Sequence, residues 1–261
     1  MRILLLCALA ICASAQNWKL VWSDEFDGPA NTLPDPDKWT YDLGHGHGWG
    51  NQELEKYTKS LDNVHLDGDG HLIIRALRDA SGGYTSARLK TLGKFSTAYG
   101  RIEARIKLPS GQGMWPAFWA MGADIRTVGW PKCGEIDIME NIGKEPGIQH
   151  GSLHGPGYSD GDSITGAYTL PAGEKLSDDF HVYGIVWKDG SIEFEFDGRP
   201  YFTATPKSLP NGKKWVFNKP FFLLLNVAVG GDWPGSPDGS TIFPQEMTVD
   251  YVRVYQPASN N

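Results

Sequence analysis

The segment from residue 180 to 204 limits the fold more than any other part of this sequence. It reads FHVYGIVWK, Asp189-Gly190, SIEFEF, Asp197-Gly198 and RPYFTAT. Asp-Gly pairs favour two-residue turns between antiparallel strands, because both positions tolerate left-handed backbone angles. Three short segments rich in aromatic and β-branched residues, joined by such turns, predict a three-strand antiparallel meander.

The rest of the chain shows strand patterns and almost no helical periodicity. Residues 71–77, 100–108 and 248–256 alternate apolar with polar side chains. Residues 221–229 (FFLLLNVAV) are continuously apolar, as a strand covered on both faces would be. Short strands, regular turn signals and Gly/Pro-rich loops predict an all-β fold, an antiparallel β-sandwich.

The composition is that of one packed globular domain. The 261 residues are 40% hydrophobic, which excludes a disordered chain, and no linker or repeat divides them. The net charge is −7 and Lys and Arg form no run, so nucleic acid is not an expected partner. Long loops are predicted at 27–60, 109–134, 155–179 and 230–247, and such loops in a compact domain usually bind a ligand.

The first fifteen residues have the organisation of a secretory signal peptide. Arg2 precedes an eleven-residue apolar run and the small-x-small cleavage site Ala13-Ser14-Ala15. Eleven residues are too few for a membrane-spanning helix, which needs about 20. We therefore predict a secreted protein, extracellular or periplasmic, with residues 16–261 as one mature domain. It makes no membrane contact after signal removal, and a monomer is the default.

Cys133 is the only cysteine that remains after signal removal, so no internal disulfide can form. A lone cysteine can act as a nucleophile, but a buried inert thiol is the more common role and the one we expect. The stability of the exported domain must then come from its core, with a bound ion as a further option.

The segment GEIDIMEN, residues 134–141, contains three acids whose spacing conflicts with a regular strand. In such a strand Glu135 and Asp137 share one face, whereas Glu140 points to the opposite, apolar face. An unpartnered carboxylate between two sheets would be strongly destabilising. A one-residue β-bulge near Ile138–Met139 removes the conflict, because it turns Glu140 to the face of the other two acids.

Three carboxyl groups on one face indicate acid–base chemistry. Neighbouring carboxylates repel, so one is expected to hold its proton to higher pH than the others. An ionised nucleophile and a protonated acid about 5–5.5 Å apart are what retaining glycoside hydrolysis requires. Two other interpretations stay open, namely a solvent-facing acidic strand and a metal site completed by ligands from elsewhere.

Several tryptophans occupy positions where a core role is less expected. Trp115 and Trp119 share one face of a predicted strand, and Trp49, Trp130 and Trp233 lie in Gly-rich loops. Flat indole rings in a cleft suit the apolar faces of pyranose rings, while polar loop residues bind the hydroxyl groups. His154, in the segment SLHGPGY, is a candidate for such hydroxyl binding.

The sequence resembles glycoside hydrolase family 16, and within it the bacterial laminarinase-like endo-β-1,3-glucanases. The resemblance covers nearly all of residues 18–256. The matching blocks, in order, are WSDEF (22–26), GWGNQE (48–53), YGRIEAR (99–105), MWPAFW (114–119), GEIDIMEN (134–141), LHGPGY (153–158), GGDWPG (230–235) and VDYV (249–252). A lone E-x-D-x-x-E would be unspecific, but eight blocks in one order are not.

The resemblance implies a β-jelly-roll sandwich with a concave substrate cleft and retaining hydrolysis. It implies Glu135 as nucleophile, Glu140 as acid/base and Asp137 as the residue that orients and tunes both. The spacing with the extra Met139 resembles the laminarinase branch, whereas the strict mixed-linkage branch keeps a regular strand. Matching sugar-subsite positions are Trp49, Asn51, Arg88, Trp115, Trp119, Trp130, His154 and Trp233.

No cofactor is implied for catalysis, but relatives often hold a structural Ca²⁺ away from the catalytic site. The matching positions are the backbone carbonyls of Glu25 and Gly70 and the carboxylate of Asp250. Asp250 alternates with Val252 and Val254 on the expected apolar face of a strand, where an uncompensated charge would be costly. Hard oxygen ligands suit Ca²⁺.

The expected function is a secreted retaining endo-β-glucanase that cleaves β-1,3 bonds in laminarin-like glucans. Activity on β-1,3-1,4 mixed-linkage glucan stays open, because linkage preference depends on loop shape. One alternative is a β-glucan-binding protein without turnover, although all three acids are intact. The other is a hydrolase or transglycosylase acting on another polysaccharide, such as a marine galactan.

Overall fold

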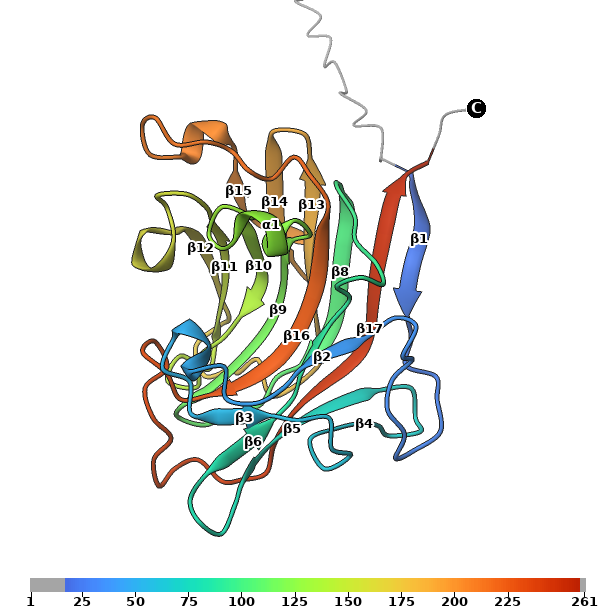
Figure 1. Cartoon of the computed structure of the whole chain (residues 1–261), viewed down its shortest axis with the longest axis vertical. Coiled ribbons are helices and arrows are strands. Elements are labelled where there is room, and N and C mark those ends of the chain that lie inside the picture. Colours follow the sequence, from blue (N-terminus) through green and yellow to red (C-terminus); the bar gives the residue numbers. More distant parts are fainter. Residues whose placement is uncertain (1–16, 259–261) are drawn as a thin grey trace, which may run out of the picture.

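Two β-sheets stack face to face in the computed structural model, which describes residues 17–258 (Figure 1). The predicted signal peptide, residues 1–15, lies outside this range. The described part of the chain is almost entirely strand and loop, with one short helix, α1 (Ile125–Val128). The predicted all-β, jelly-roll type of sandwich is confirmed. None of the described helices has the length and apolar character needed to cross a bilayer.

The first sheet has ten strands. Its order is β15 (Arg199–Ala204), β14 (Ser191–Phe196), β13 (His181–Lys188), β8 (Gly100–Lys107), β17 (Gln245–Pro257), β5 (Leu72–Arg78), β6 (Tyr84–Ser86) and β3 (Glu55–Tyr57), with β1 (Trp18–Asp24) paired to β17 and β4 (Val64–Leu66) paired to β5. All pairings are antiparallel except β3 with β6. Because Trp18 pairs with Pro257, the two ends of the described chain lie side by side (Figure 1).

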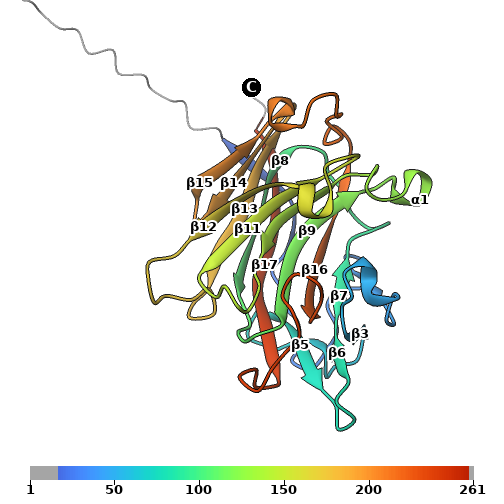
Figure 2. The ribbon, with the colours of Figure 1, turned by 90° about the vertical axis from the view of Figure 1, so that its left-hand side faces the viewer.

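The second sheet has seven strands and carries the site described below. Its order is β12 (Ile164–Thr169), β11 (Ile148–His154), β10 (Glu135–Glu140), β9 (Met114–Gly122), β16 (Phe221–Val229), β7 (Arg88–Lys90) and β2 (Thr40–Asp42). Figure 1 shows β9 and β16 curving together, and Figure 2 looks onto the strands of this sheet side by side.

The meander predicted from the Asp-Gly turns is present as β13, β14 and β15, all antiparallel. Asp197 and Gly198 both have positive φ angles, 48° and 72°, as a two-residue hairpin turn demands. The apolar segment 221–229 forms β16, which lies between β9 and β7 and is buried along its whole length.

The core lies between the two sheets. It includes Ile102, Ala104 and Ile106 from β8, which are fully buried as their alternation predicted. Trp187 of β13 is 1% exposed, and its indole N–H donates to the backbone oxygen of Phe217 at 3.1 Å. Cys133 is a buried free thiol, as expected, and burial raises its pKa to about 11.

Two expectations about the chain are wrong in detail. Three of the predicted loops contain strands, since β2 and β3 lie within 27–60, β9 within 109–134 and β12 within 155–179.

Asp250 does not share the buried face of Val252 and Val254. A register shift between Val249 and Tyr251 marks a bulge in β17, and it turns the Asp250 carboxylate outward to Arg105 at 2.7 Å.

Candidate active site

A cleft of about 910 Å³ lies on the face of the second sheet that points away from the core. Strands β7, β9, β10, β11 and β16 form its floor, and the loops around Trp49, Trp130 and Trp233 contribute to its walls. It brings together all the predicted catalytic and sugar-binding residues: Trp49, Asn51, Arg88, Trp115, Trp119, Trp130, Glu135, Asp137, Glu140, His154 and Trp233.

The predicted bulge in β10 is present. Asp137 pairs with Trp119 of β9, but Met139 pairs with the next residue, Phe118, so Ile138 is the extra residue. Ile138 and Met139 are both fully buried in the core. As a consequence Glu140 returns to the cleft face that already carries Glu135 and Asp137.

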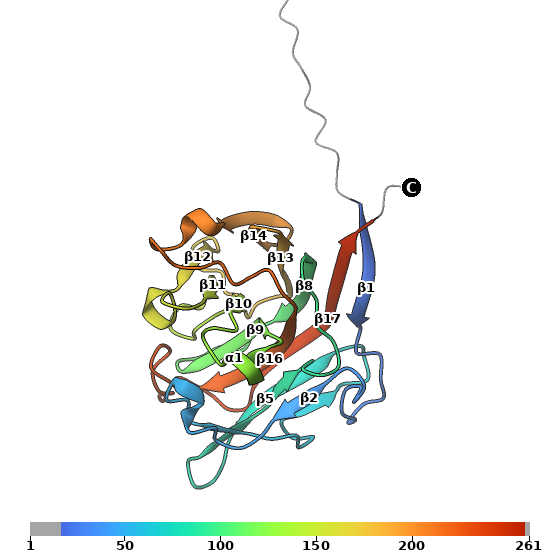
Figure 3. The same ribbon diagram turned by 45° about the horizontal axis from the view of Figure 1, so that its top comes forward.

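Each of the two glutamates receives a hydrogen bond from an indole. Trp115 Nε1 donates to Glu140 Oε1 at 2.9 Å, and Trp130 Nε1 donates to Glu135 Oε2 at 2.9 Å. Trp115 comes from β9 beside the catalytic strand, whereas Trp130 comes from the loop that follows α1 (Figure 3). Two tryptophans predicted as sugar platforms therefore also fix the orientation of the carboxyl groups.

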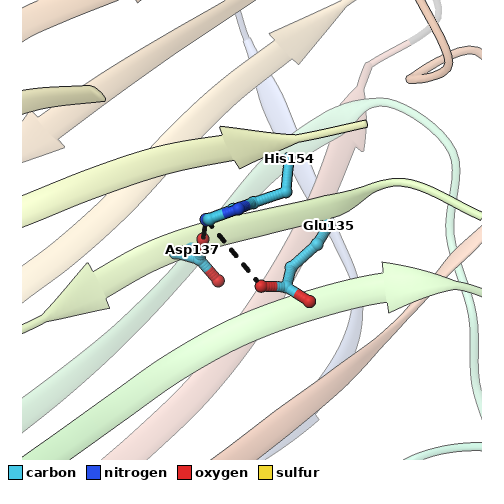
Figure 4. A group of neighbouring side chains, drawn as sticks. All are labelled: Glu135, Asp137 and His154. Atoms are coloured by element: carbon cyan, nitrogen blue, oxygen red, sulfur yellow. Dashed lines mark ion pairs between the residues drawn. The ribbon is translucent and has the colours of Figure 1, made fainter. Parts of the chain in front are cut away.

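His154 faces the acids from β11 (Figure 4). Its Nε2 atom lies 3.0 Å from Asp137 Oδ2 and 3.9 Å from Glu135 Oε1. The backbone N–H of Asp160 donates to the other ring nitrogen, Nδ1, at 3.1 Å. Because Nδ1 is an acceptor, the imidazole proton is on Nε2, the ring nitrogen that lies near the carboxyl groups. His154 thus helps to orient Asp137 and Glu135.

Burial sets the electrostatics of the three acids. Burial, and next the charge of Asp137, raises the pKa of Glu135 to about 8, against the opposing effects of His154, Arg88 and Trp130. Burial likewise raises the pKa of Asp137. The pKa of Glu140 is raised well above its usual range by burial and then by Asp137. The group therefore retains protons at neutral pH.

Glu135, Asp137 and His154 also offer three ligand atoms within 4.8 Å of one another, which raises the question of a metal. A metal ion on His154 would need the lone pair of Nε2. The hydrogen bond from Asp160 to Nδ1 favours the tautomer in which Nε2 carries the proton. In that tautomer Nε2 has no free lone pair, so the arrangement does not suit a metal ligand.

One end of the cleft is built from cation–π contacts. The Arg88 guanidinium lies 5.2 Å from the ring centroid of Trp49 and 4.6 Å from that of Trp119. Trp49 itself has left-handed backbone angles (φ 51°, ψ 21°), which are strained for a non-glycine residue. A Cβ atom at Gly46 would overlap the Trp49 ring, so only glycine fits there. The loop therefore keeps a strained backbone conformation in which Trp49 lines the cleft.

Three aromatic side chains, Trp115, Trp233 and His150, pack together in the cleft lining and form what we call the aromatic corner. Trp233 stands at 87° to Trp115 with 5.5 Å between ring centroids, and His150 packs against Trp233 at 5.1 Å. Glu145 holds the far side of His150, with 3.0 Å between Oε2 and Nε2. Lys144 Nζ donates to the backbone oxygen of Trp233 at 2.8 Å, which ties the two loops together.

Sequence reasoning missed several cleft residues. Asn226 is the polar residue inside the apolar strand β16; it accepts from Trp119 Nε1 at 2.8 Å and donates to Tyr57 at 3.1 Å. His150 and Ser152 of β11 line the cleft together with His154. The signals were present, since an asparagine interrupts an apolar run and positions 150, 152 and 154 share one strand face.

The three positions proposed for Ca²⁺ lie away from the cleft. Asp24 pairs with Val252, so the antiparallel register carries Glu25 next to the bulge at Asp250. A Cβ atom at Gly70 would lie 3.6 Å from Asp27 Oδ1, which brings Gly70 to the same segment. The three positions are therefore on neighbouring segments, where Arg105 pairs with Asp250 Oδ2 and Arg253 pairs with the Glu25 carboxylate.

Comparison with known proteins places the chain among glycoside hydrolases. The family model described as glycosyl hydrolases family 16 matches residues 49–253. A β-glucanase from Rhodothermus marinus is 45% identical over 255 residues, covering 93% of this chain and 86% of that protein. A glucan endo-1,3-β-glucosidase A1 from Niallia circulans is 38% identical over 261 residues, covering 91% of this chain but only 38% of that longer protein.

Among solved structures, the catalytic domain of an endo-1,3-β-glucanase (laminarinase) from Thermotoga petrophila superposes with a TM-score of 0.87. The two sequences are 48% identical, and the match covers 94% of this chain and 100% of that domain.

Proposed function

This chain belongs to glycosyl hydrolases family 16, and from that premise we propose that it is a retaining endo-β-1,3-glucanase acting on laminarin-like glucans. The single observation that carries the proposal is the bulged strand β10. It sets Glu135, Asp137 and Glu140 on the cleft face among tryptophans. Carboxyl groups with unequal pKa values between aromatic platforms suit hydrolysis of a sugar chain.

In the first chemical step Glu135 acts as the nucleophile. Its carboxylate oxygen forms a bond to the anomeric carbon while the bond from that carbon to the glycosidic oxygen breaks. Glu140 gives its proton to the departing oxygen. This assignment follows the family resemblance, and it is supported by Arg88, His154 and Trp130, which all lower the pKa of Glu135 and so favour its ionised form.

In the second step a water molecule displaces the Glu135 carboxylate from the anomeric carbon. Glu140, now ionised, takes a proton from a water molecule whose oxygen attacks the anomeric carbon. The bond to Glu135 breaks, the carboxylate is restored, and the product keeps its β configuration. Asp137 stays in place between the two, 3.0 Å from His154 Nε2, while burial keeps the pKa of Glu140 high for the next cycle.

The charge of the cleft supports a neutral polysaccharide. Besides the three buried acids of β10, its lining includes Glu53, Asp160 and Asp232, whereas Arg88 is the only Arg or Lys among the lining residues in the described chain. A sulfated or uronic-acid polymer would be repelled by such a surface. This favours a glucan over anionic galactans, although one relative 31% identical in sequence is named a keratan-sulfate endo-1,4-β-galactosidase.

Mixed-linkage glucan is a second candidate substrate. Two relatives from Rhizobium meliloti, each 32% identical over 176 residues, are named endo-1,3-1,4-β-glycanases. A non-catalytic role is weaker. A β-1,3-glucan-binding protein from Penaeus monodon is 35% identical over 180 residues, but this chain keeps all three carboxyl groups in the cleft.

The test is to incubate the mature chain with laminarin, mixed-linkage glucan, agarose and carboxymethylcellulose, and to separate the products over time. A ladder of oligosaccharides from laminarin, absent with Glu135→Gln, supports an endo-acting hydrolase with Glu135 in the chemistry. The relative rate on mixed-linkage glucan then decides the linkage preference. Bound but uncleaved laminarin would instead point to a binding protein.

We also propose that the protein is exported through residues 1–15, works as a monomer and carries a structural Ca²⁺ near Glu25, Gly70 and Asp250. The basis for export is the signal-like sequence, and the basis for the ion is the oxygen-rich neighbourhood beside the β17 bulge. N-terminal sequencing of the secreted protein tests the cleavage before Gln16. Sedimentation tests the monomer.

A further inference from the structure

A glutamine lies in the core directly behind the catalytic bulge. Along β11, His150, Ser152 and His154 face the cleft, so Gln149 and Gly151 face the space between the sheets. Gln149 is fully buried, with 0% of its surface exposed. A buried amide is costly unless it forms hydrogen bonds. Its partners therefore show what it is there to stabilise.

The partners of the Gln149 amide nitrogen are two backbone carbonyls, one on β10 and one on β11. Nε2 donates to Ile138 oxygen at 3.0 Å and to His150 oxygen at 3.0 Å. Ile138 is the extra residue of β10, and a bulged residue is left out of the regular ladder. His150 is the strand partner of Glu140. One side-chain amide therefore joins the extra residue of the bulge to the residue opposite Glu140.

Gly151, the residue two positions after Gln149, lets β11 pack closely against the other sheet. Asp137 pairs with Ser152 and Glu140 with His150, so Gly151 alone stands opposite the two bulge residues. A Cβ atom there would lie 2.5 Å from the Tyr201 hydroxyl and 2.6 Å from the Phe194 ring of the other sheet. The bulge sends two side chains into the core, and a glycine opposite leaves room for them.

We propose that Gln149 is a positioning residue for Glu140: its amide holds the β10 bulge closed and so keeps the acid/base in line with the nucleophile. The proposal rests on the proposed retaining mechanism. Glu140 follows Ile138 by two residues, so movement of the Ile138 carbonyl moves the acid. Trp119 and Arg88, at two of the expected sugar-subsite positions, stand on β9 and β7 and not on the two strands that this hydrogen bond joins.

The test replaces Gln149 with methionine, which is of similar length but cannot donate a hydrogen bond. Misplacing the acid is expected to lower kcat on laminarin about 10- to 100-fold, while KM stays within about twofold because ground-state binding is unchanged. Tyr183→Phe is the matched control, since it removes the hydroxyl of a fully buried tyrosine in β13 and leaves Gln149 and the bulge carbonyls untouched. It is expected to keep wild-type kcat.

Two readouts separate positioning of Glu140 from general loss of structure. A dinitrophenyl laminaribioside needs no protonation of its leaving group, so Gln149→Met should form its glycosyl-enzyme nearly as fast as wild type. Azide attacks the anomeric carbon of that intermediate without a base and displaces Glu135 as a carboxylate. It should therefore raise turnover of the variant, with β-glycosyl azide as product, and leave wild type unchanged.

Deletion of Met139 supplies an independent comparison. It converts the bulged strand to a regular one, in which the Ile138 carbonyl can rejoin the ladder. Gln149→Met should then have a much smaller effect on kcat than in the bulged protein.

Equal losses on laminarin and on the activated substrate, without azide rescue, would overturn the proposal and leave Gln149 a purely structural residue. That outcome does not depend on whether the deletion variant folds. Inactivity of the wild type on laminarin is a different result and would refute the proposed function instead.

Discussion

Trp115 donates its indole N–H to Glu140 Oε1 at 2.9 Å, so a residue that lines the sugar cleft also holds the acid/base. The same ring stands at 87° to Trp233 in the aromatic corner. Substrate binding and proton transfer are therefore coupled through one side chain. The coupling can be broken by a change that keeps an aromatic ring and removes the N–H.

Trp115→Phe is expected to move the alkaline limb of the kcat/KM profile upward. The N–H stabilises the ionised form of Glu140 and lowers its pKa, so its loss raises that pKa. Glu140 must be protonated in the first step, so activity should persist to higher pH, by about one unit. Trp187→Phe, which loses an indole hydrogen bond in the core, is the control. A downward shift would contradict the assignment of Glu140 as the acid.

His154→Asn is expected to move both limbs upward. His154 lowers the pKa of Glu135 and of Glu140, so its removal raises both. Glu135 must be ionised to attack, and the acidic limb should therefore lie at higher pH than in the wild type. The measurement is kcat/KM on laminarin as a function of pH. An acidic limb that does not move would show that Glu135 is not the group titrating there.

Glu55 predicts a pH dependence of stability rather than of activity. It is fully buried, its Oε2 accepts from the backbone N–H of Val229 at 2.7 Å, and burial followed by Glu53 raises its pKa. The folded state keeps this proton while the unfolded state loses it above pH 4.5, so stability falls as pH rises from there. The slope is at most about 1.4 kcal/mol per pH unit.

Glu55→Gln removes this titration and keeps an acceptor for Val229. Urea unfolding at pH 5 and pH 8 should show a smaller difference for the variant than for the wild type. An identical difference in the two proteins would mean that Glu55 is ionised in the folded state.

Calcium is expected to stabilise the fold without taking part in turnover. An ion that binds only the folded state raises Tm in proportion to the logarithm of its concentration. Chelation should lower Tm at unchanged kcat below the transition, and Asp250→Asn should abolish the response. Asp189→Asn, an exposed acid in a turn, should keep it. Unchanged melting after chelation, with no ion found by elemental analysis, would refute the site.

Local sequence determined much of the fold and the position of the acids. Asp-Gly turns specify β13 to β15 because their backbone angles are intrinsic to those residues. The bulge at Ile138 was predictable because a regular strand would have buried the Glu140 carboxylate, which is strongly unfavourable. The β17 bulge carried a similar signal, since Val249 and Val252 are both apolar and both buried although three residues apart.

Only the tertiary structure decided which groups meet. The hydrogen bond from Trp130 to Glu135 depends on how a loop folds back over its own strand. The contact of Gln149 with Ile138 depends on the pairing of β11 with β10, and that of Asn226 with Trp119 on the pairing of β16 with β9. Pairing register is a long-range property, set by how two sheets bury their apolar faces together. Sequence patterns reveal which face a residue occupies, but not the partner that lies across from it on the neighbouring strand.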